Sequence, residues 1–236
     1  MLYEEERQQK ITDYVQSRER ASVQELAQQF QVSESTVRRD LKILMEKEDR
    51  YRIQKEAIAK AAAALVQEGD TIVLDSGTTT YYLAKELKSF KQLTVVTNSV
   101  MVAQELLTHK GIELVLTGGT LRHESLAMVG PLTENAMESV YVNKAFVATN
   151  SMDPIIGLTT PNMLEASAKR SMFRSAKQVI LLADHSKYGR VSFAKVAELS
   201  DIDHCVTDDR ISEKALKELE AAGISVTVVK VGGEKP

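Results

Sequence analysis

The sequence predicts two parts of different fold class, an all-α head over residues 1–47 and a doubly wound α/β body over residues 56–236. Two observations predict this division. Residues 1–47 carry apolar side chains at helical spacing and no strand pattern. From residue 56 onward short β-branched runs alternate with helical patterns, and strands that alternate with helices pair in parallel through right-handed crossovers. The charged stretch between the two parts, residues 48–55, is predicted to be a linker.

The composition excludes several classes of protein. With 236 residues, 43% of them hydrophobic, the chain can bury a core, and the single Cys205 cannot form an intrachain disulfide. The absence of Trp argues against a stacking platform for single-stranded nucleic acid. No apolar run approaches the roughly 18 residues of a membrane span, and the N-terminus lacks the pattern of a signal peptide. We therefore expect a cytoplasmic protein, and its formal net charge of −3 requires any DNA-binding surface to be local.

The head is predicted to hold three helices. The first spans roughly residues 5–17. The second begins after Ser22, because Ser22 and Glu25 have the spacing of a capping box, in which each side chain bonds the backbone N–H of the other residue. The third follows a short turn, has Ser33 as its N-cap and extends from residue 34 to about residue 47. Its apolar stripe consists of Val37, Leu41 and Leu44.

The second and third predicted helices have the arrangement of a helix-turn-helix. Two helices joined by a short turn, the second with a cationic outer face, place that second helix in the major groove of DNA. Its first turns meet base edges, and nearby cations meet phosphates. The alternative is that the cations form only the solvated face of an amphipathic helix. The predicted DNA-binding residues are Ser33, Ser35, Thr36, Arg38, Arg39 and Lys42, with Ser35, Thr36 and Arg39 at bases and Arg38 and Lys42 at phosphates.

The body is predicted to contain seven strands with helices between most of them. The Pro- and Gly-containing segment Asp153–Pro161 is predicted to be a structured loop. The predicted helices are Glu56–Gln67, Thr79–Leu87, Val100–His109, Leu164–Ala176 and Ser212–Ala222. The predicted strands are Thr71–Leu74, Leu93–Thr97, Ile112–Leu116, Ala145–Ala148, Val179–Ala183, Cys205–Thr207 and Val226–Val231.

Polar loops follow four of the predicted strands, at residues 75–80, 97–99, 117–122 and 183–190. The first combines Gly77 with Ser and Thr residues and opens a helix, which suits a phosphate because backbone N–H groups at a helix N-terminus point at an anion. Ligands of α/β sheets bind at the carboxyl ends of the strands, where these loops converge. The sequence thus predicts a site for a small polar ligand, the alternative for residues 75–80 being an ordinary strand-to-helix turn.

The run Val32-Ser33-Glu34-Ser35-Thr36-Val37-Arg38-Arg39-Asp40-Leu41 resembles the helix-turn-helix signature of the DeoR family of bacterial transcriptional repressors, and the resemblance continues through the body. It implies a winged-helix-like head, a Rossmann-like effector domain similar to ribose-5-phosphate isomerase, and repression of a sugar-metabolism operon. The implied partners are double-stranded operator DNA and a sugar phosphate, such as fructose 1-phosphate or a hexose 6-phosphate, bound by a homodimer or homotetramer. In that family a β-hairpin wing follows the recognition helix. Here Lys47 runs straight into the linker, so the wing is deleted or a segment is missing from the sequence.

The resemblance also implies roles for individual residues of the body. Ser76, Gly77, Thr78 and Thr79 would hold the phosphate. The sugar would meet Asp75, Asn98 and Arg122, with Gly119 allowing close approach, Lys187 adding a charge, and Glu165 and Lys169 reaching the site from one helix. For Glu165 and Lys169, at positions i and i+4, the alternative is a surface ion pair. The segment around Asn150 and Asp153 is less Gly-rich than is usual in the family, which leaves sugar selectivity open.

Two other functions are alternatives to a regulator. A sugar-phosphate isomerase with an accessory helical head would need a base, for which Asp75, Glu165 or Asp184 is available, but it would not need Arg38 and Arg39. A purely structural partner-binding protein would explain neither the helix-turn-helix nor the polar loops. The four His residues lack metal-ligand spacing, and Ser76 and Ser186 lack the sequence context of an activated nucleophile. We therefore expect neither an enzyme nor a metal or cofactor site.

Overall fold

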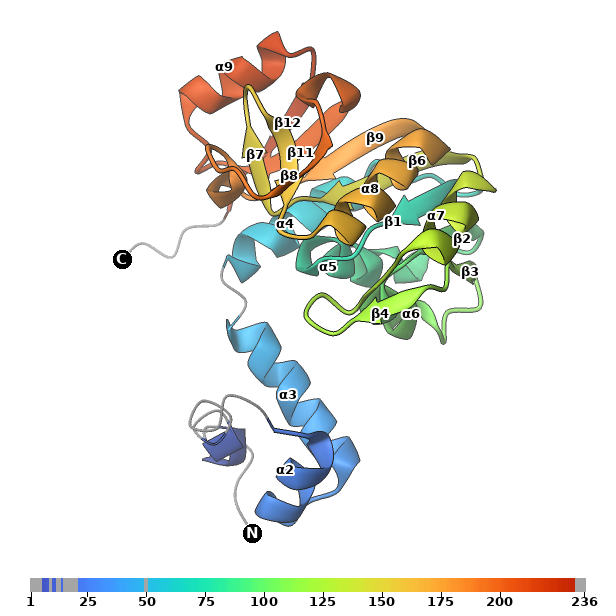
Figure 1. The fold of residues 1–236 in the computed structure, drawn as a ribbon, viewed down its shortest axis with the longest axis vertical. Coiled ribbons are helices and arrows are strands. Elements are labelled where there is room, and N and C mark those ends of the chain that lie inside the picture. The colour runs from blue at the N-terminus through green and yellow to red at the C-terminus, as the bar shows by residue number, and fades with distance from the viewer. Residues whose placement is uncertain (1–5, 9, 12–13, 15–20, 49–50, 232–236) are drawn as a thin grey trace. The chain divides into compact units, whose positions relative to one another are not determined.

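The computed structural model describes residues 6–8, 10–11, 14, 21–48 and 51–231 (Figure 1). The chain divides into two compact units, Met1–Arg52 and Ile53–Pro236. No helix in the described part of the chain is long and apolar enough to cross a membrane.

The first unit contains the predicted helix-turn-helix. Helix α2 spans Val23–Phe30 and α3 spans Glu34–Glu48. The capping box is confirmed: Ser22 Oγ accepts a bond from Glu25 N over 3.2 Å, and Ser22 N donates to Glu25 Oε2 over 2.7 Å. Gln31 ends α2 in a left-handed conformation, with φ 53°. Of the predicted first helix, the described residues 6–8, 10–11 and 14 are helical, and the remainder lies outside the described residues.

A small apolar core holds these helices together. Ile11, Leu26 and Val37 are each at most 1% exposed, and the rings of Tyr14 and Phe30 meet edge to face at 5.9 Å. The stripe predicted on the third helix is therefore confirmed at Val37. The side chain of Leu44 lies outside the described residues.

The predicted linker is shorter than expected. Helix α4 spans Arg52–Ala63, so it begins four residues before Glu56, and residues 52–55 of the predicted linker form its first turn. The physical reason is that the buried face of α4 starts at two polar residues, Gln54 and Lys55, which are 5% and 8% exposed. Only three residues separate α3 from α4, which is too few for a β-hairpin. The chain therefore has no room for a wing at this place.

The second unit is built on a seven-stranded sheet in which every pairing is parallel, in the order β12-β11-β9-β6-β1-β2-β3. All seven predicted strands are confirmed, with ends within three residues of those expected. They are β1 Thr71–Leu74, β2 Leu93–Thr97, β3 Ile112–Leu116, β6 Val142–Ala148, β9 Ala176–Leu182, β11 His204–Asp208 and β12 Ser225–Val229.

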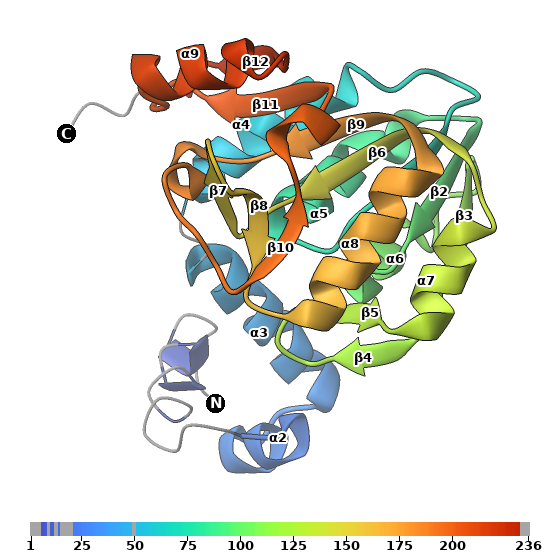
Figure 2. The same cartoon turned by 45° about the horizontal axis from the view of Figure 1, so that its top comes forward.

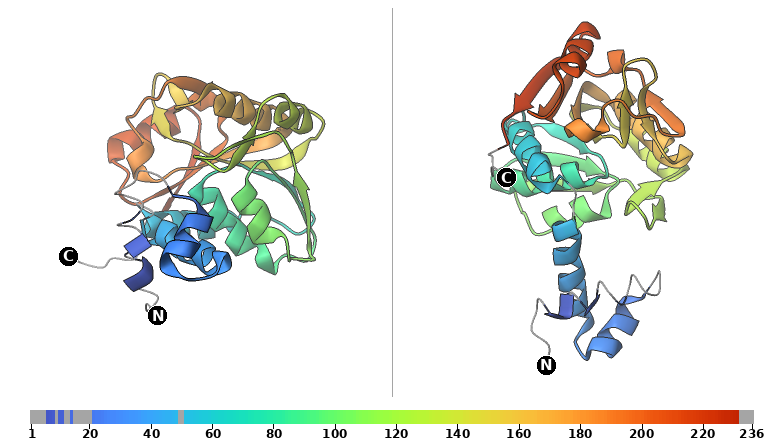
Figure 3. Two further views of the ribbon diagram at one scale, coloured as in Figure 1. Left: turned by 60° about the horizontal axis from the view of Figure 1, so that its bottom comes forward. Right: turned by 90° about the vertical axis from the view of Figure 1, so that its left-hand side faces the viewer.

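Helices cover both faces of this sheet, which confirms the doubly wound prediction (Figure 2). On one face Ile72 and Phe146 pack with α4, α5 and α6, and on the other face Val73 and Val147 pack with α7, α8 and α9. Figure 3 shows the same layers from two further sides. The helices beyond α4 are α5 Thr78–Glu86, α6 Val100–Leu106, α7 Pro131–Glu138, α8 Met163–Ser175 and α9 Glu213–Ala221, with 3-10 turns at Leu87–Ser89, His185–Lys187 and Leu199–Asp201.

The sequence did not predict six short elements. These are α7, the hairpin of β4 (Thr120–Arg122) with β5 (Ala127–Val129), and a small sheet of β7 (Ser151–Asp153), β8 (Gly157–Thr160) and β10 (Ala194–Ala197). The prediction of a loop over Asp153–Pro161 is wrong, because this segment includes the end of β7 and all of β8. Antiparallel pairing of β8 with both β7 and β10 organises it.

The order of the strands reverses direction beside β1. From β1 the chain builds β2 and β3 on one side and then returns to build β6 on the other side. This reversal is a topological switch point, where open α/β sheets bind ligands outside the carboxyl ends of the strands. The loops that follow β1 and β6 lie there, and a side chain at Gly77 would come within 3.0 Å of Ala148 Cβ.

Candidate effector site and DNA-binding helix

The outer face of α3 carries most of the predicted DNA-binding residues. Ser33 Oγ caps the helix by accepting from Thr36 N over 3.1 Å, and it lies 2.8 Å from both Ser35 Oγ and Thr36 Oγ1. Ser35, Arg38 and Arg39 are exposed, and Thr36 is half-buried. Arg38 also forms an exposed ion pair with Glu34 at 3.1 Å. The side chain of Lys42 lies outside the described residues.

An ion pair that the sequence did not predict holds α3 from its inner side. Arg7 Nε lies 2.5 Å from Asp40 Oδ2, and Arg7 Nη2 lies 3.0 Å from Asp40 Oδ1. Both residues are buried. Burial alone would raise the pKa of Asp40, but hydrogen bonds from Arg7 and Gln8 and the charges of Arg7 and Arg39 together lower it. A signal was present in the sequence, since a charged residue three positions after Val37 lies on the apolar side of the helix.

The loop between β1 and α5 leaves a helix N-terminus open. Gly77 is the N-cap of α5 and no side chain caps the helix there. Thr80 Oγ1 instead closes the loop from inside, donating to Asp75 O over 2.7 Å and lying 3.0 Å from Gly77 O. Thr78 is exposed, Ser76 and Gly77 are partly exposed, and Thr79 is buried. Since the first N–H groups of a helix have no intrahelical partner, this end of α5 can bind an anion.

Behind this loop, Asp75 and Lys169 form a buried ion pair. Lys169 Nζ also donates to Ala148 O over 2.9 Å, and Ala148 N donates to Asp75 Oδ2 over 3.0 Å. The predicted alternative of a surface ion pair between Glu165 and Lys169 is wrong, because Lys169 is buried and bonds Asp75. The physical reason is that the order of the strands brings Asp75, at the end of β1, next to Lys169 on α8. The spacing of residues within one helix carries no information about this contact.

Glu165 connects three segments around the site. Its Oε1 accepts from Arg122 Nε over 3.0 Å and from Ser125 Oγ over 2.6 Å, and its Oε2 accepts from Thr160 Oγ1 over 3.2 Å. Thr160 Oγ1 also lies 2.9 Å from Asn150 Oδ1. Burial alone would raise the pKa of Glu165, but these hydrogen bonds and the charges of Lys169 and Arg122 lower it. The β4–β5 hairpin is thereby fastened to α8 and to β8.

Asn98 and Gly119 lie at the ends of the two strands that follow β1. Asn98 is 2% exposed, its Nδ2 donates to Met128 O over 2.9 Å, and its Oδ1 has no hydrogen-bond partner among the described residues. Gly119 has a φ of +126°, and a Cβ there would lie 2.2 Å from Thr133 Oγ1. A glycine is needed at position 119 because neighbouring protein atoms leave no room for a Cβ, so the structure explains this residue without a ligand.

Lys187 stands apart from the other predicted site residues. It lies in the 3-10 turn after β9, and β6 separates β9 from β1, so the carboxyl ends of β1 and β9 are about 10 Å apart. In the same loop His185 Nδ1 lies 2.8 Å from Asp208 Oδ2. The structure thus brings together Asp75, Ser76, Gly77, Thr78, Thr79, Asn98, Arg122, Glu165 and Lys169 around β1, β2 and α8.

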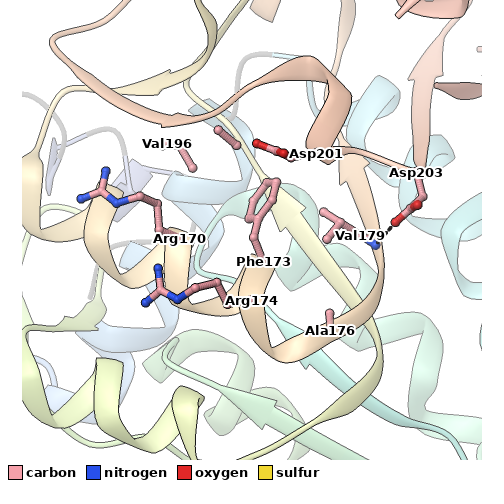
Figure 4. Close-up of a pocket in the computed structure, with 9 residues that line it drawn as sticks. Arg170, Phe173, Arg174, Ala176, Val179, Val196, Asp201 and Asp203 are labelled. Carbon is pink, nitrogen blue, oxygen red and sulfur yellow. Dashed lines mark hydrogen bonds between the residues drawn. The ribbon is translucent and has the colours of Figure 1, made fainter. Parts of the chain in front are cut away.

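A separate hollow lies elsewhere in the second unit. It has a volume of about 420 Å³ and is lined by Arg170, Phe173, Arg174, Asp201 and Asp203, among others (Figure 4). None of the predicted effector residues lines it. Among the described residues no group of three or more His, Cys, Asp or Glu side chains is placed to hold a metal ion.

Comparison with solved structures finds partial similarity in the sheet unit. Ribose 5-phosphate isomerase A from Methanocaldococcus jannaschii matches with a TM-score of 0.45 and 18% identity, over 59% of this chain and 55% of that chain. The delta subunit of eIF2B from Chaetomium thermophilum matches with a TM-score of 0.45 and 18% identity, over 67% and 58% of the two chains. Similarity at this level says nothing about activity.

Curated relatives match almost the whole chain. The uncharacterized HTH-type transcriptional regulator YulB of Bacillus subtilis is 37% identical over 95% of this chain and 96% of its own length. The regulator GlpR of Haloferax volcanii is 36% identical over 94% and 96%, and the repressor GlcR of Bacillus subtilis is 32% identical over 97% and 98%. The match to YulB extends over 249 positions, more than the 236 residues of this chain, so YulB has residues that this chain lacks.

Family descriptions match both units. Residues 7–53 match the DeoR-like helix-turn-helix domain, and residues 51–209 match the DeoR C terminal sensor domain. The two matches meet without an intervening segment, in agreement with the three residues between α3 and α4. The chain belongs to the DeoR family of helix-turn-helix transcriptional regulators.

Proposed function

We propose that this protein represses a sugar-metabolism operon and that a phosphorylated sugar, bound in the α/β unit, changes its affinity for operator DNA. DNA binding and a small-molecule effector follow from the family. The observation that carries the proposal is the uncapped N-terminus of α5, because it lies at the switch point of the sheet and remains accessible at Ser76, Gly77 and Thr78.

The groups around this helix end suit a ligand that carries hydroxyls as well as a phosphate. In the proposed arrangement the loop Ser76–Thr79 holds the phosphate. The buried Oδ1 of Asn98 accepts a bond from a hydroxyl, since leaving that oxygen unpaired costs about 1–3 kcal/mol. Among the remaining predicted residues, Gly119, Arg122 and Glu165 border the ligand. Asp75 and Lys169 support the loop from behind, since both are buried, and Lys187 contributes from the more distant β9 loop.

For the first unit we propose that α3 enters the major groove. Ser35, Thr36 and Arg39 meet base edges, and Ser33, Arg38 and Lys42 serve phosphates. One helix-turn-helix reads one half-site, so we propose a homodimer or homotetramer that reads paired half-sites. Without a wing, few phosphates are neutralised per chain, and assembly compensates for weak binding by each unit.

The isomerase alternative is not supported. Curated relatives over nearly the full chain are named as regulators and repressors. Asp75, the first candidate for a catalytic base, is 0% exposed and bonded to Lys169 and to the backbone of Ala148. A base must reach the proton that it abstracts, and this carboxylate has no open approach.

A thermal-unfolding screen of the full chain tests the proposal. The panel contains fructose 1-phosphate, hexose 6-phosphates and tagatose phosphates, with the unphosphorylated sugars and inorganic phosphate as references. A ligand at 100 times its Kd stabilises the folded state by about 2.7 kcal/mol. Each ligand that shifts the unfolding temperature is then tested for its effect on operator affinity in a gel-shift titration. If no sugar phosphate changes either quantity, the proposed effector class is wrong.

Two variants locate the site. Thr78→Asp places a carboxylate in the first turn of α5, where it stabilises the helix by about 0.3–1 kcal/mol and competes with a phosphate. We expect this variant to remain folded and to lose the increase in unfolding temperature that the sugar phosphate causes in the unaltered protein. Leu132→Asp adds the same charge to the first turn of α7 at a residue that is 68% exposed, and we expect it to keep the shift. Loss of the shift in both variants would exclude the N-terminus of α5 as the specific site.

A further inference from the structure

We infer that Arg7 and Asp40 are positioning residues for DNA recognition. Their buried ion pair sets the rotation of α3 about its own axis and hence the direction in which Arg39 points toward DNA. The inference rests on the proposed role of α3 as the recognition helix. It assigns a function in sequence reading to two residues that are buried inside the first unit.

The pair has the geometry of a directional anchor. The guanidinium of Arg7 reaches both oxygens of Asp40, over 2.5 and 3.0 Å, and Gln8 Nε2 donates to Oδ1 over 3.4 Å. Arg7 is 7% exposed and Asp40 is 0% exposed. A two-pronged contact between planar groups restrains both distance and orientation, which a single hydrogen bond does not. It joins the N-terminal helical residues to α3 across 33 positions of sequence.

The other contacts that hold α3 are less directional. Among the described residues of the first unit, the fully buried apolar side chains are Ile11, Leu26 and Val37. Apolar contact is non-directional, and cores of roughly correct volume lose a unique arrangement before they lose stability. Partly buried apolar residues such as Phe30 and Leu41 add to this core. These contacts are non-directional, and the pair of Arg7 with Asp40 adds a directional restraint on the rotation of α3.

The rotation matters because Arg39 and Asp40 are neighbours. Consecutive residues of an α-helix are 100° apart, so the buried Asp40 places Arg39 on the exposed side. Side chains extend about 5–6 Å from the helix axis, and a turn of about 20° therefore moves a side-chain end by about 2 Å. A displacement of that size breaks an Arg–guanine contact whose two bonds span about 2.7–3.2 Å.

A purely stabilising role is the alternative, and single truncations do not separate the two. Removing one partner of a buried pair leaves an uncompensated charge and destabilises the fold whatever the pair does for DNA. Replacing both partners by apolar residues of similar volume is often neutral or stabilising. Arg7→Met with Asp40→Leu is therefore the informative double variant. Arg7→Lys is the second variant, since it keeps the charge but not the two-pronged geometry.

The experiment uses the full chain and two duplexes of equal length. One is selected from random-sequence DNA by the unaltered protein, and the other is a scrambled version of it. Circular dichroism establishes a temperature at which each variant has the helix content of the unaltered protein, and affinities are measured there. Lys10→Ala is the matched control, because Lys10 forms an exposed ion pair with Glu6 at 3.0 Å on the same helical segment.

We expect both pair variants to bind the selected duplex about tenfold more weakly or worse, as for a lost bidentate base contact, and the scrambled duplex nearly unchanged. Lys10→Ala is expected to retain its preference. The inference is overturned if the folded variants prefer the selected duplex as strongly as the unaltered protein does. It is equally overturned if, at that temperature, affinity for both duplexes falls by the same factor, because the pair then does not affect which sequence is preferred. If the unaltered protein selects no sequence, the proposed role of α3 itself fails.

Discussion

The ammonium group of Lys169 donates to the carboxylate of Asp75, and neither residue is open to solvent, with exposed fractions of 6% and 0%. The pair joins α8 to the carboxyl end of β1 across 94 positions of sequence. Both partners also bond the backbone of Ala148 at the end of β6. Three elements are thus fastened together at the switch point. The pair supports the open end of α5 from below, while Ser76, Gly77 and Thr78 remain accessible above it.

Lys169→Met should destabilise the second unit strongly. The substitution leaves the carboxylate of Asp75 buried without its cation, and breaking a buried pair in this way costs about 3–5 kcal/mol. Asp75→Asn with Lys169→Met removes both charges and should cost less than Lys169→Met alone. Urea unfolding followed by circular dichroism measures both free energies of unfolding. A loss below about 1 kcal/mol for Lys169→Met is the behaviour of a solvated pair and would contradict the buried arrangement.

The hydrogen bonds to Glu165 predict how stability depends on pH. Its pKa is lowered from an ordinary value of 4.5, because hydrogen bonds from Ser125 and Thr160 and nearby positive charges outweigh the opposing effect of burial. A group with a lowered pKa in the folded state stabilises the fold above its unfolded pKa, and this contribution is lost as the pH falls through the folded value. The free energy of unfolding of Glu165→Gln should therefore decrease less between about pH 4.5 and lower pH than that of the unaltered protein.

Urea unfolding at a series of pH values from 7 downward measures this effect. Ser125→Ala provides an independent check, because it removes one of the bonds that lower the pKa. We expect the acid loss of stability in Ser125→Ala to be smaller than in the unaltered protein and to be complete at a higher pH, because the folded pKa of Glu165 then lies closer to its unfolded pKa. If both variants lose stability at acid pH as the unaltered protein does, Glu165 does not contribute to that loss.

Gly119 and Gly118 are adjacent glycines with different predicted sensitivities. Both have positive φ, +126° and +71°, but a Cβ at Gly119 would lie 2.2 Å from Thr133 Oγ1 and 2.7 Å from Val129 O, whereas a Cβ at Gly118 meets nothing within 4 Å. Gly118→Ala should cost about 1–2 kcal/mol from its left-handed backbone alone. Gly119→Ala should cost about 1–3 kcal/mol more from overpacking. Thermal unfolding of the two variants measures the difference, and equal losses would contradict the close approach to Thr133.

The sequence predicted the seven strands of the main sheet mostly from short apolar runs rich in β-branched residues, as in Thr71–Leu74. The strands of the small sheet and of the β4–β5 hairpin have three or four residues and carry no such run, as in Gly157–Thr160 and Ala194–Ala197. Helix α7 had one usable signal, since Pro131 occupies its first turn after Gly130. In α4 the buried face begins at Gln54 and Lys55, and hydropathy patterns cannot detect polar residues that become buried.

For the candidate site, the sequence predicted which loops converge but not which side chains pair. The carboxyl ends of parallel strands meet at one edge, so the loops after β1 and β2 could be grouped without coordinates. The partner of Lys169 depends on the order of the strands in the sheet. This order places Asp75 next to Lys169 on α8, and Glu165 pairs with Arg122 instead. Arg7 and Asp40 pair across the helix-turn-helix in the same way. Local spacing carries no information about such contacts between distant segments.

Arg38 and Arg39 are adjacent on α3 and should respond differently to truncation. Arg39 is proposed to read a base, so Arg39→Ala should lose about 1–3 kcal/mol with the selected duplex and accept other bases at one position. Arg38 is proposed to meet a phosphate and its side chain is 65% exposed, so Arg38→Ala should weaken binding to all sequences about equally and reduce the slope of log K against log salt by about 1. Fluorescence anisotropy at several salt concentrations, with the selected and scrambled duplexes, measures both effects. If Arg39→Ala instead changes the salt slope and keeps its sequence preference, Arg39 contacts a phosphate and the assignment of the two residues is reversed.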